Sequence, residues 1–246
     1  MQTDSISLNK FISDTGYCSR READKLIAEG RVLLNEVPAK LGNRYSFGDS
    51  VEVDGSLITT EDELKKREDL LYIAFNKPVG ITTTTEEKIK GNMISFINHK
   101  KRIFPIGRLD KDSEGLIFLT NDGDIVNKIL RAGNNHEKEY IVKVDKPITD
   151  FFVKGMSNGV RIKDGLTNPC FVKKLSNHTF KIILTQGMNR QIRKMCDKFG
   201  YTVMNLQRIR IMNIKLDVAV GRWRYLNDAE MAEIMEMVKD SSKTHQ

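Results

Sequence analysis

An apolar run, GLIFLT at residues 115–120, follows directly on the polar loop GRLDKDSE at residues 107–114. The run is β-branched and aromatic, which predicts a buried β-strand that holds the preceding loop rigidly. Asp110 lies in that loop two residues after Arg108, and a neighbouring arginine favours the charged form of a carboxylate. An ionised aspartate can act as a covalent nucleophile. The segment therefore indicates an aspartate that is held in place for chemistry.

Two structural alternatives exist for Asp110. An aspartate in a turn is most often a cap or an Asx-turn, and we assign that role to Asp112. Residues 110–121 also match part of an EF-hand calcium loop, with acidic residues at positions 1, 3 and 5 and glycine at position 6. The twelfth position needs a bidentate glutamate but is Asn121, and the second half reads as a strand. The sequence therefore argues against calcium.

Motifs for other common chemistries are missing from the sequence. The four histidines lack zinc-site spacing, and there is no Gly-x-Ser-x-Gly, phosphate-loop or dinucleotide motif. The three cysteines lie far apart without a Cys-x-x-Cys pair, which favours a reducing compartment. No apolar run approaches the ~18 to 20 residues of a membrane span, and the start lacks a signal-peptide core. We expect a cytoplasmic protein without metal or cofactor.

Helix and strand patterns divide the chain into three parts. Residues 1–55 predict two small helices, the second capped by Ser19, followed by a few strands. Residues 56–69 are charged and weakly periodic, which predicts a linker. In residues 70–246, strand-like apolar runs alternate with shorter helical ones, and the last helix begins with a capping box at Asn227.

Charge is concentrated in the third part. The chain carries 40 Lys and Arg against 33 Asp and Glu, but residues 70–246 alone carry 30 against 19, a net charge of +11. A basic run is often only a solvated face. Here the most basic stretch contains Gly187, Asn189 and Gln191, which are able to contact phosphates and base edges. We therefore expect a nucleic acid as partner.

Four motifs in the third part resemble those of RNA pseudouridine synthases. They are NKPVG (76–80), GRLDKDSEGLIFLTNDGD (107–124), KEYIV (138–142) and QGMNRQIRKM (186–195). The branch is the one that includes the small-subunit synthase A and the large-subunit synthases B, E and F. RAGNNHEKEYIV together with GMNRQIRKM is most similar to the large-subunit synthases of type F.

The resemblance also covers the first part of the chain. Residues 1–55 resemble the alpha-L RNA-binding domain, the type found in ribosomal protein S4, although Asn35-Glu36 stands where that domain often turns on Asn-Gly. The resemblance implies the α+β class. A small N-terminal RNA-binding domain, a linker at 56–69 and a catalytic domain at 70–246 are expected. The catalytic domain should have a mixed, mainly antiparallel sheet flanked by helices.

The reaction that the resemblance implies is the conversion of uridine to pseudouridine in RNA, without metal or cofactor. Asp110 matches the nucleophile, which adds either to uracil C6 or to ribose C1′. Tyr140 matches a tyrosine that stacks on the uracil, with a core tyrosine as its alternative. Arg193 matches the basic residue that pairs with the aspartate. Arg108 matches an arginine that fills the space of the flipped uridine, and Lys77 shapes the pocket wall.

The expected substrate is large-subunit (23S) ribosomal RNA, either free or within an assembly intermediate, and a structured transfer RNA is the alternative. Arg20, Arg21 and Lys25 are expected to form a basic RNA-binding face on the capped helix, unless that face is only solvated. A non-catalytic RNA-binding or ribosome-assembly factor is the rival function. The presence of Asp110, Tyr140 and Arg193 together speaks against it. We expect the protein to act as a monomer, away from membranes.

Overall fold

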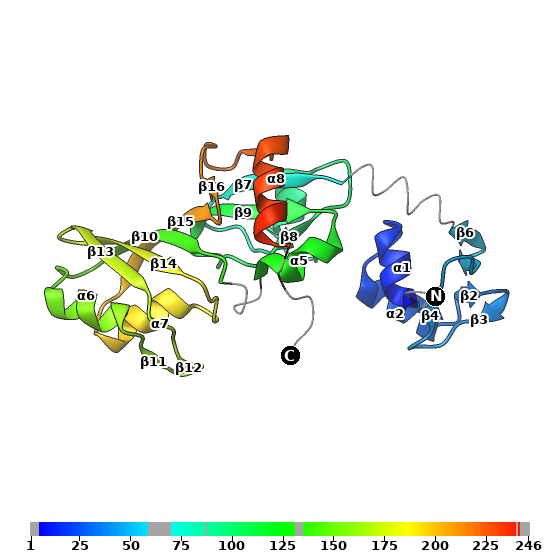
Figure 1. Ribbon diagram of the computed structural model, residues 1–246, viewed down its shortest axis with the longest axis horizontal. Helices are drawn as coiled ribbons and strands as arrows, with labels where there is room; N and C mark the ends of the chain where they lie inside the picture. Colours follow the sequence, from blue (N-terminus) through cyan, green and yellow to red (C-terminus); the bar gives the residue numbers. More distant parts are fainter. Residues whose placement is uncertain (1–4, 59–69, 87, 131–134, 240, 242–246) are drawn as a thin grey trace. The chain divides into compact units, whose positions relative to one another are not determined.

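The computed structural model describes residues 5–58, 70–86, 88–130, 135–239 and 241 (Figure 1). The chain forms two compact units, divided after Leu70. The first unit has one hydrophobic core, and the second has two cores on opposite faces of a sheet.

Among its described residues, the first unit has two helices and six short strands. The helices are α1 (Leu8–Asp14) and α2 (Arg20–Ala28). The strands are β1 (Ile6–Ser7), β2 (Val32–Leu34), β3 (Val37–Pro38), β4 (Arg44–Tyr45), β5 (Val51–Val53) and β6 (Ser56–Ile58). β1 pairs with β4, and the other four form a sheet in the order β3-β2-β5-β6. The Oγ of Ser19 accepts the backbone N–H of Glu22 at 3.1 Å, which confirms Ser19 as the cap of α2.

Strand β6 corrects the expected end of the first part. Val51 of β5 pairs with Ile58 of β6, so residues 56–58 belong to the sheet rather than to the linker expected at 56–69. Ile58 is buried in the core of this unit, which the weak periodicity of the segment did not reveal. Residues 59–69 of that expected linker lie outside the described residues.

The turn between β2 and β3 forms despite its unusual sequence. Asn35 and Glu36 both have positive φ angles, 52° and 64°, as a two-residue type I′ hairpin turn requires. The side chain of Asn35 donates to Asp49 at 3.0 Å and accepts the backbone N–H of Ser50 at 2.9 Å. These bonds help to hold a turn in which Glu36 replaces the glycine that is usual there.

A nine-stranded sheet forms the centre of the second unit. Its main order is β13-β14-β10-β15-β9-β7-β17, with β16 paired to β15 and β8 paired to β9. The strands are β7 (Tyr72–Lys77), β8 (Phe104–Ile106), β9 (Glu114–Thr120), β10 (Lys138–Val144), β13 (Phe171–Ser176), β14 (Thr179–Leu184), β15 (Val203–Ile211), β16 (Ile214–Lys215) and β17 (Trp223–Tyr225). A separate hairpin joins β11 (Arg161–Ile162) and β12 (Gly165–Leu166). Among the described strands of the large sheet, β9 and β15 pair in parallel and the other pairs are antiparallel, so the sheet is mixed and mainly antiparallel, as predicted.

Helices pack on both faces of this sheet. The two faces are separated by alternation along β9, because Ile117 and Leu119 enter one core while Leu116 and Phe118 enter the other. The first core includes side chains from α4 (Met93–Ile97), α6 (Asp150–Ser157) and α7 (Gln191–Lys198). The second includes side chains from α5 (Gly123–Leu130) and α8 (Asp228–Met237). Figure 1 shows α6 and α7 together beside β10 and β14, and α5 beside β8.

The parallel contact between β9 and β15 depends on Gly115. Arg208 pairs directly with Gly115, and a Cβ on Gly115 would lie 2.3 Å from the carbonyl oxygen of Arg208. Gly115 also has a φ of +108°, which L side chains rarely adopt. Glycine therefore lets β15 approach the start of β9, directly after the loop that carries Asp110.

The capping box predicted for the last helix is also confirmed. Asn227 accepts the backbone N–H of Glu230 at 2.9 Å, and the Glu230 side chain accepts that of Asn227 at 2.9 Å. In the described residues, no helix is long and apolar enough to cross a membrane.

Candidate active site

A cavity of about 530 Å³ lies in the second unit, next to the loop between β8 and β9. Its wall is built by that loop, by β10 and β15, and by the segment that leads from β14 into α7. Four of the residues to which the resemblance gives a role line it together: Arg108, Asp110, Tyr140 and Arg193. These four residues come from three separate segments of the chain and meet around one space.

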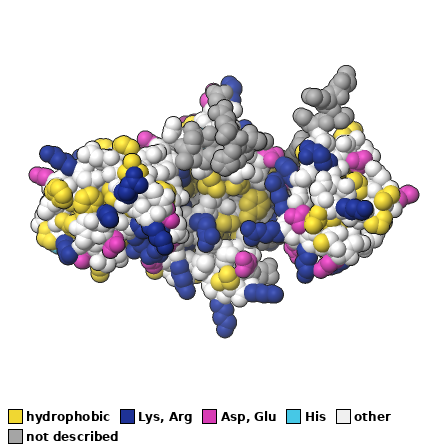
Figure 2. Space-filling model, turned by 90° about the horizontal axis from the view of Figure 1, so that it is seen from below, with side chains coloured by type: hydrophobic (Ala, Val, Ile, Leu, Met, Phe, Trp, Pro, Cys, Tyr) yellow, Lys and Arg dark blue, Asp and Glu magenta, His cyan; other side chains and the backbone are white. Residues whose placement is uncertain are grey.

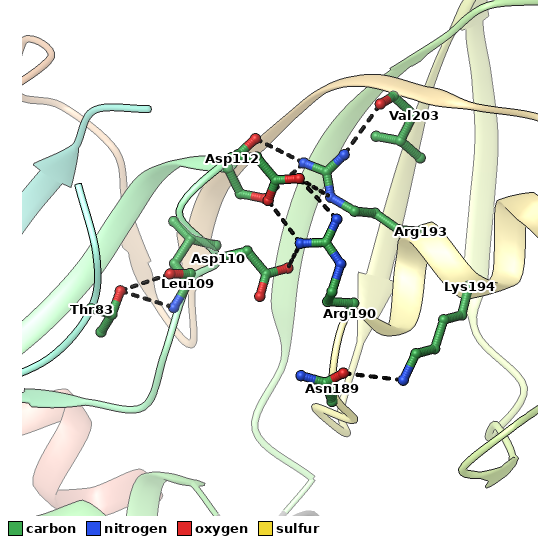
Figure 3. A network of polar contacts seen from close by, with 10 residues as sticks. Thr83, Leu109, Asp110, Asp112, Asn189, Arg190, Arg193, Lys194 and Val203 are labelled. Carbon is green, nitrogen blue, oxygen red and sulfur yellow. Dashed lines mark hydrogen bonds and ion pairs between the residues drawn. The ribbon is translucent and has the colours of Figure 1, made fainter. Parts of the chain in front are cut away.

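Neighbouring backbone and a buried hydroxyl hold the Asp110 loop in place. The Oγ1 of Thr83 donates to the carbonyl oxygen of Leu109 at 2.7 Å, as Figure 3 shows. On the other side of Asp110, the backbone N–H of Gly80 donates to the carbonyl oxygen of Lys111 at 2.7 Å. The loop therefore has a fixed anchor on each side of the proposed nucleophile, which agrees with the rigidity expected from the strand that follows.

Among the described residues, Arg190 is the arginine that lies within ion-pair distance of the Asp110 carboxylate. Its Nη1 lies 3.7 Å from Oδ2 of Asp110, and its guanidinium also makes two hydrogen bonds to Asp112 of 3.0 and 2.8 Å. Arg190 immediately precedes α7 and has a left-handed backbone, with φ +49°. Its hydrogen bonds lower the pKa of the Asp112 carboxyl and raise the pKa of the Arg190 guanidinium. One side chain therefore serves two carboxylates in the same loop (Figure 3).

The expected ion pair between Arg193 and Asp110 is not formed. Arg193 instead donates to the carbonyl oxygen of Asp112 at 2.8 Å and to Ser113 Oγ at 3.0 Å, and its Nε lies 3.5 Å from the Asp112 carboxylate. Arg193 lies one helical turn beyond Arg190, so it reaches the back of the loop. Sequence reasoning missed Arg190, because the only local signal was a second arginine three residues before Arg193.

Tyr140 lies in the cavity wall beside two buried cations that sequence reasoning also missed. Arg208, its neighbour across β10 and β15, has its guanidinium carbon 6.0 Å from the centre of the Tyr140 ring. Lys138 lines the same cavity and donates to the carbonyl oxygen of His136 at 3.1 Å. Burial, with the charge of Arg208 adding to it, lowers the pKa of Lys138 to about 8. The wall is therefore strongly basic around one aromatic ring.

Lys77 takes a different place from the one expected. Its side chain is 0% exposed, and its Nζ donates to the carbonyl oxygens of Pro78 at 2.9 Å and Ile81 at 2.8 Å. Burial lowers the pKa of Lys77 to about 8. It is not among the residues that line the cavity. Lys77 therefore holds the turn that follows β7 and does not present its charge to RNA.

The other residues expected to bind RNA are exposed. Arg108 lies at the cavity with an exposed side chain. Arg20, Arg21 and Lys25 are exposed on α2 of the first unit, and Lys25 has an ion pair of 3.6 Å with Glu29. Within the part of the chain that the structure describes, no three His, Cys, Asp or Glu side chains gather as they would around a metal ion.

Comparisons with known protein families identify the class of this chain. Residues 71–198 match the RNA pseudouridylate synthase family, and residues 7–51 match the S4 domain. The chain therefore belongs to the RNA pseudouridine synthases, with an S4 domain at its N-terminus. The resemblance drawn from the motifs, the α+β class and the enzymatic activity are all confirmed.

Individual relatives place the chain more closely. It is 55% identical over 239 residues to the dual-specificity RNA pseudouridine synthase RluF of Escherichia coli K12, covering 97% of this chain and 81% of that one. It is 33% identical over 210 residues to the ribosomal large subunit pseudouridine synthase B of Bacillus subtilis, covering 82% and 83%. A crystal structure of a pseudouridylate synthase matches with a TM-score of 0.68 and 25% identity, covering 94% and 100%. The chain is thus a pseudouridine synthase of the RluF type that acts on RNA.

Proposed function

We propose that this enzyme isomerises specific uridines of large-subunit (23S) ribosomal RNA, with Asp110 as the nucleophile and the target base flipped into the cavity. The observation that carries the proposal is the position of Asp110 on the wall of a space of about 530 Å³ that it shares with Tyr140. A space of this size suits a small-molecule group such as one nucleoside. A base paired within a helix would have to leave its stack to reach it.

The proposed reaction is balanced without any external reactant. The N1–C1′ bond of uridine breaks, the uracil turns, and a C5–C1′ bond forms. The proton on C5 leaves, and N1 gains one. Asp110 supplies the anion that adds to C6 or to C1′, and both routes need its ionised form. The Arg190 guanidinium, 3.7 Å away, places a positive charge beside the Asp110 carboxylate.

Tyr140 and Arg193 complete the proposed machinery in different ways. The Tyr140 side chain lines the cavity and offers a ring on which the uracil can stack. Arg193 is proposed to hold in place the loop that carries Asp110, since it donates to the carbonyl oxygen of Asp112 and to the hydroxyl of Ser113. Arg108, exposed beside the cavity, is proposed to fill the place of the flipped uridine.

Charge supports RNA as a large, multiply contacted partner. Residues 70–246 carry a net charge of +11, and Figure 2 shows Lys and Arg side chains beside exposed apolar ones on one face. Phosphate contacts from such side chains supply affinity without sequence choice. The S4 domain is proposed to add target choice through Arg20, Arg21 and Lys25, which are exposed on one helix.

Names of relatives support the choice of ribosomal RNA. One is named for the ribosomal large subunit, and the 55% identical one is named for dual specificity. A second RNA, such as a transfer RNA, is therefore the alternative substrate. A ribosomal target places the enzyme's action in the cytoplasm. The acting form is proposed to be a monomer.

The proposal is tested by mapping pseudouridine across all cellular RNA with and without the gene, and after return of the native gene or an Asp110→Asn copy. We expect one or more large-subunit sites to vanish, to reappear with the native copy, and to stay absent with Asp110→Asn. Loss confined to transfer RNA would overturn the substrate. A non-catalytic assembly factor would leave every site modified.

A further inference from the structure

Arg208 is a buried cation without a counter-ion in the wall of the cavity. Its side chain is 4% exposed, and among the described residues it has no carboxylate within ion-pair distance. The Nε donates to the carbonyl oxygen of Leu116 at 2.6 Å. The Nη1 reaches the carbonyl oxygen of Arg108 only at 3.5 Å, and the Nη2 has no hydrogen-bond partner in the described part of the chain. Most of the donors of this guanidinium are therefore unused.

Such an arrangement is costly for a folded protein. A buried charge needs a partner, and a buried donor left without an acceptor carries the full desolvation cost of that group. Lys138 adds a second cation to the same wall, and the two charges repel. The glycine at position 115 nevertheless keeps β15 close enough to hold Arg208 there. We expect the substrate to supply the hydrogen-bond acceptor that the Arg208 guanidinium lacks.

We propose that the Arg208 guanidinium hydrogen-bonds a carbonyl oxygen of the target uracil and stabilises the negative charge that the ring carries during the reaction. This inference rests on the proposed function and deepens it. When the N1–C1′ bond breaks, its electron pair stays on the ring and spreads over N1, O2 and O4. If Asp110 instead adds to C6, the electron pair of the C5–C6 bond moves toward O4. Both routes place charge on a carbonyl oxygen.

The position of Arg208 fits this role. Its guanidinium carbon lies 6.0 Å from the centre of the Tyr140 ring, so a uracil that stacks on Tyr140 is beside it. Its Nη1 faces the backbone of Arg108, two residues before the nucleophile. A donor fixed in a water-poor wall interacts more strongly with the charged ring than with neutral uridine. Loss of Arg208 should therefore lower the rate constant more than the affinity for RNA.

The first test separates binding from chemistry. Single-turnover pseudouridine formation and the Kd for RNA are measured for the native enzyme, Arg208→Gln and Arg208→Lys. We expect Arg208→Gln to lower the rate constant about 100-fold, with Kd changed less than about threefold, and Arg208→Lys to recover part of the rate. Arg210→Gln is the matched control, because Arg210 is on the same strand but pairs with Glu137 and Glu139. Equal rate losses for both strand variants, or a weaker Kd with an unchanged rate, would overturn the inference.

The second test asks whether the contact is to the uracil itself. RNAs carrying 2-thiouridine or 4-thiouridine at the target replace one carbonyl oxygen by sulfur, a weaker acceptor. In the native enzyme one of these changes should lower the rate constant, and in Arg208→Gln the same change should cost nothing further. If Arg208→Gln fails to fold, Arg208→Lys gives the same comparison. Additive losses, or no sulfur effect in the native enzyme, would contradict the contact. Failure of the proposed function would look different, because the native enzyme would then modify no uridine.

Discussion

The guanidinium of Arg190 lies 3.7 Å from the carboxylate of Asp110 while it forms two hydrogen bonds with Asp112. The two aspartates are separated by one residue, so a single arginine can serve both from the start of α7. Asp112 thereby fixes the arginine, and the arginine places positive charge beside the proposed nucleophile. This gives the second aspartate of the loop a role, although the proposed reaction needs only one.

Asp112→Asn should consequently impair turnover without touching the nucleophile. The change weakens the hold on Arg190 and on Arg193, and misplacement of a catalytic group by about 1 Å can cost about 100-fold in rate. We expect a fall of about 10- to 100-fold in the single-turnover rate constant, with RNA affinity nearly unchanged. Asp217→Asn is the control, since Asp217 has a similar pair with Arg224 but does not line the cavity. Equal effects of both variants would contradict the role given to Asp112.

Local sequence patterns predicted the elements but not all of the site. The strand after Asp110, the cap Ser19 and the capping box at Asn227 depend on neighbours within a few residues, and all three are present. The place of Arg208 depends on the parallel pairing of β9 with β15, which joins residues about 90 positions apart. Nothing in the local spacing encodes that register.

Two other residues, Arg190 and Lys77, also have contacts that the local sequence did not predict. Arg190 lies close to Asp110 and has a left-handed backbone. This conformation is rare for arginine, and the local sequence does not predict it. Lys77 was expected in the pocket wall, but it is the last residue of a strand that is buried up to its end, and the following turn offers two carbonyl oxygens to its ammonium. A sequence motif can indicate that a residue has a role, but the contacts of its side chain depend on tertiary packing.

Gly115→Ala should destabilise the second unit strongly. Its Cβ would lie 2.3 Å from the Arg208 carbonyl oxygen, in a conformation that alanine rarely adopts. We expect a loss of about 3 kcal/mol or more in the free energy of unfolding, measured by urea denaturation. Gly187→Ala is the matched control, because nothing lies within 4 Å of a Cβ at that position. Similar stabilities for the two variants would contradict the close approach of β9 and β15.

Stability should rise with pH through the titration of Lys77. Burial lowers its pKa from 10.5 to about 8, so between these values the unfolded state binds more protons than the folded state. The cost of the buried charge is therefore full below pH 8 and disappears as pH approaches 10.5. Relative to Lys77→Met, the unfolding free energy of the native protein should increase by about 3 kcal/mol across this window. The unfolding free energies of both proteins are measured by urea denaturation across this pH range. If the two plots against pH run parallel, Lys77 is not buried as a charge.

The N-terminal unit should be dispensable for folding but not for binding. Residues 5–58 have their own core, and the second unit has separate ones. A protein that starts at residue 70 should keep cooperative unfolding while its affinity for natural RNA falls about tenfold, because a second module adds effective concentration. Filter binding checks this, with Arg20→Glu in the full chain as the comparison. If the shortened protein and Arg20→Glu both bind RNA with the native affinity, the first unit takes no part in RNA recognition.

The role of Asp110 is tested most directly by tritium release from ribosomal RNA labelled as [5-³H]uridine, with native enzyme and Asp110→Asn side by side. The substitution removes the reacting anion and hardly changes volume, and the loop keeps its anchors at Leu109 and Lys111. Asp110→Asn should fold and bind RNA as the native enzyme does, because phosphate contacts elsewhere supply most of the affinity. The account predicts that its tritium release falls to background. Release at the native rate by a folded, RNA-bound Asp110→Asn protein would contradict it.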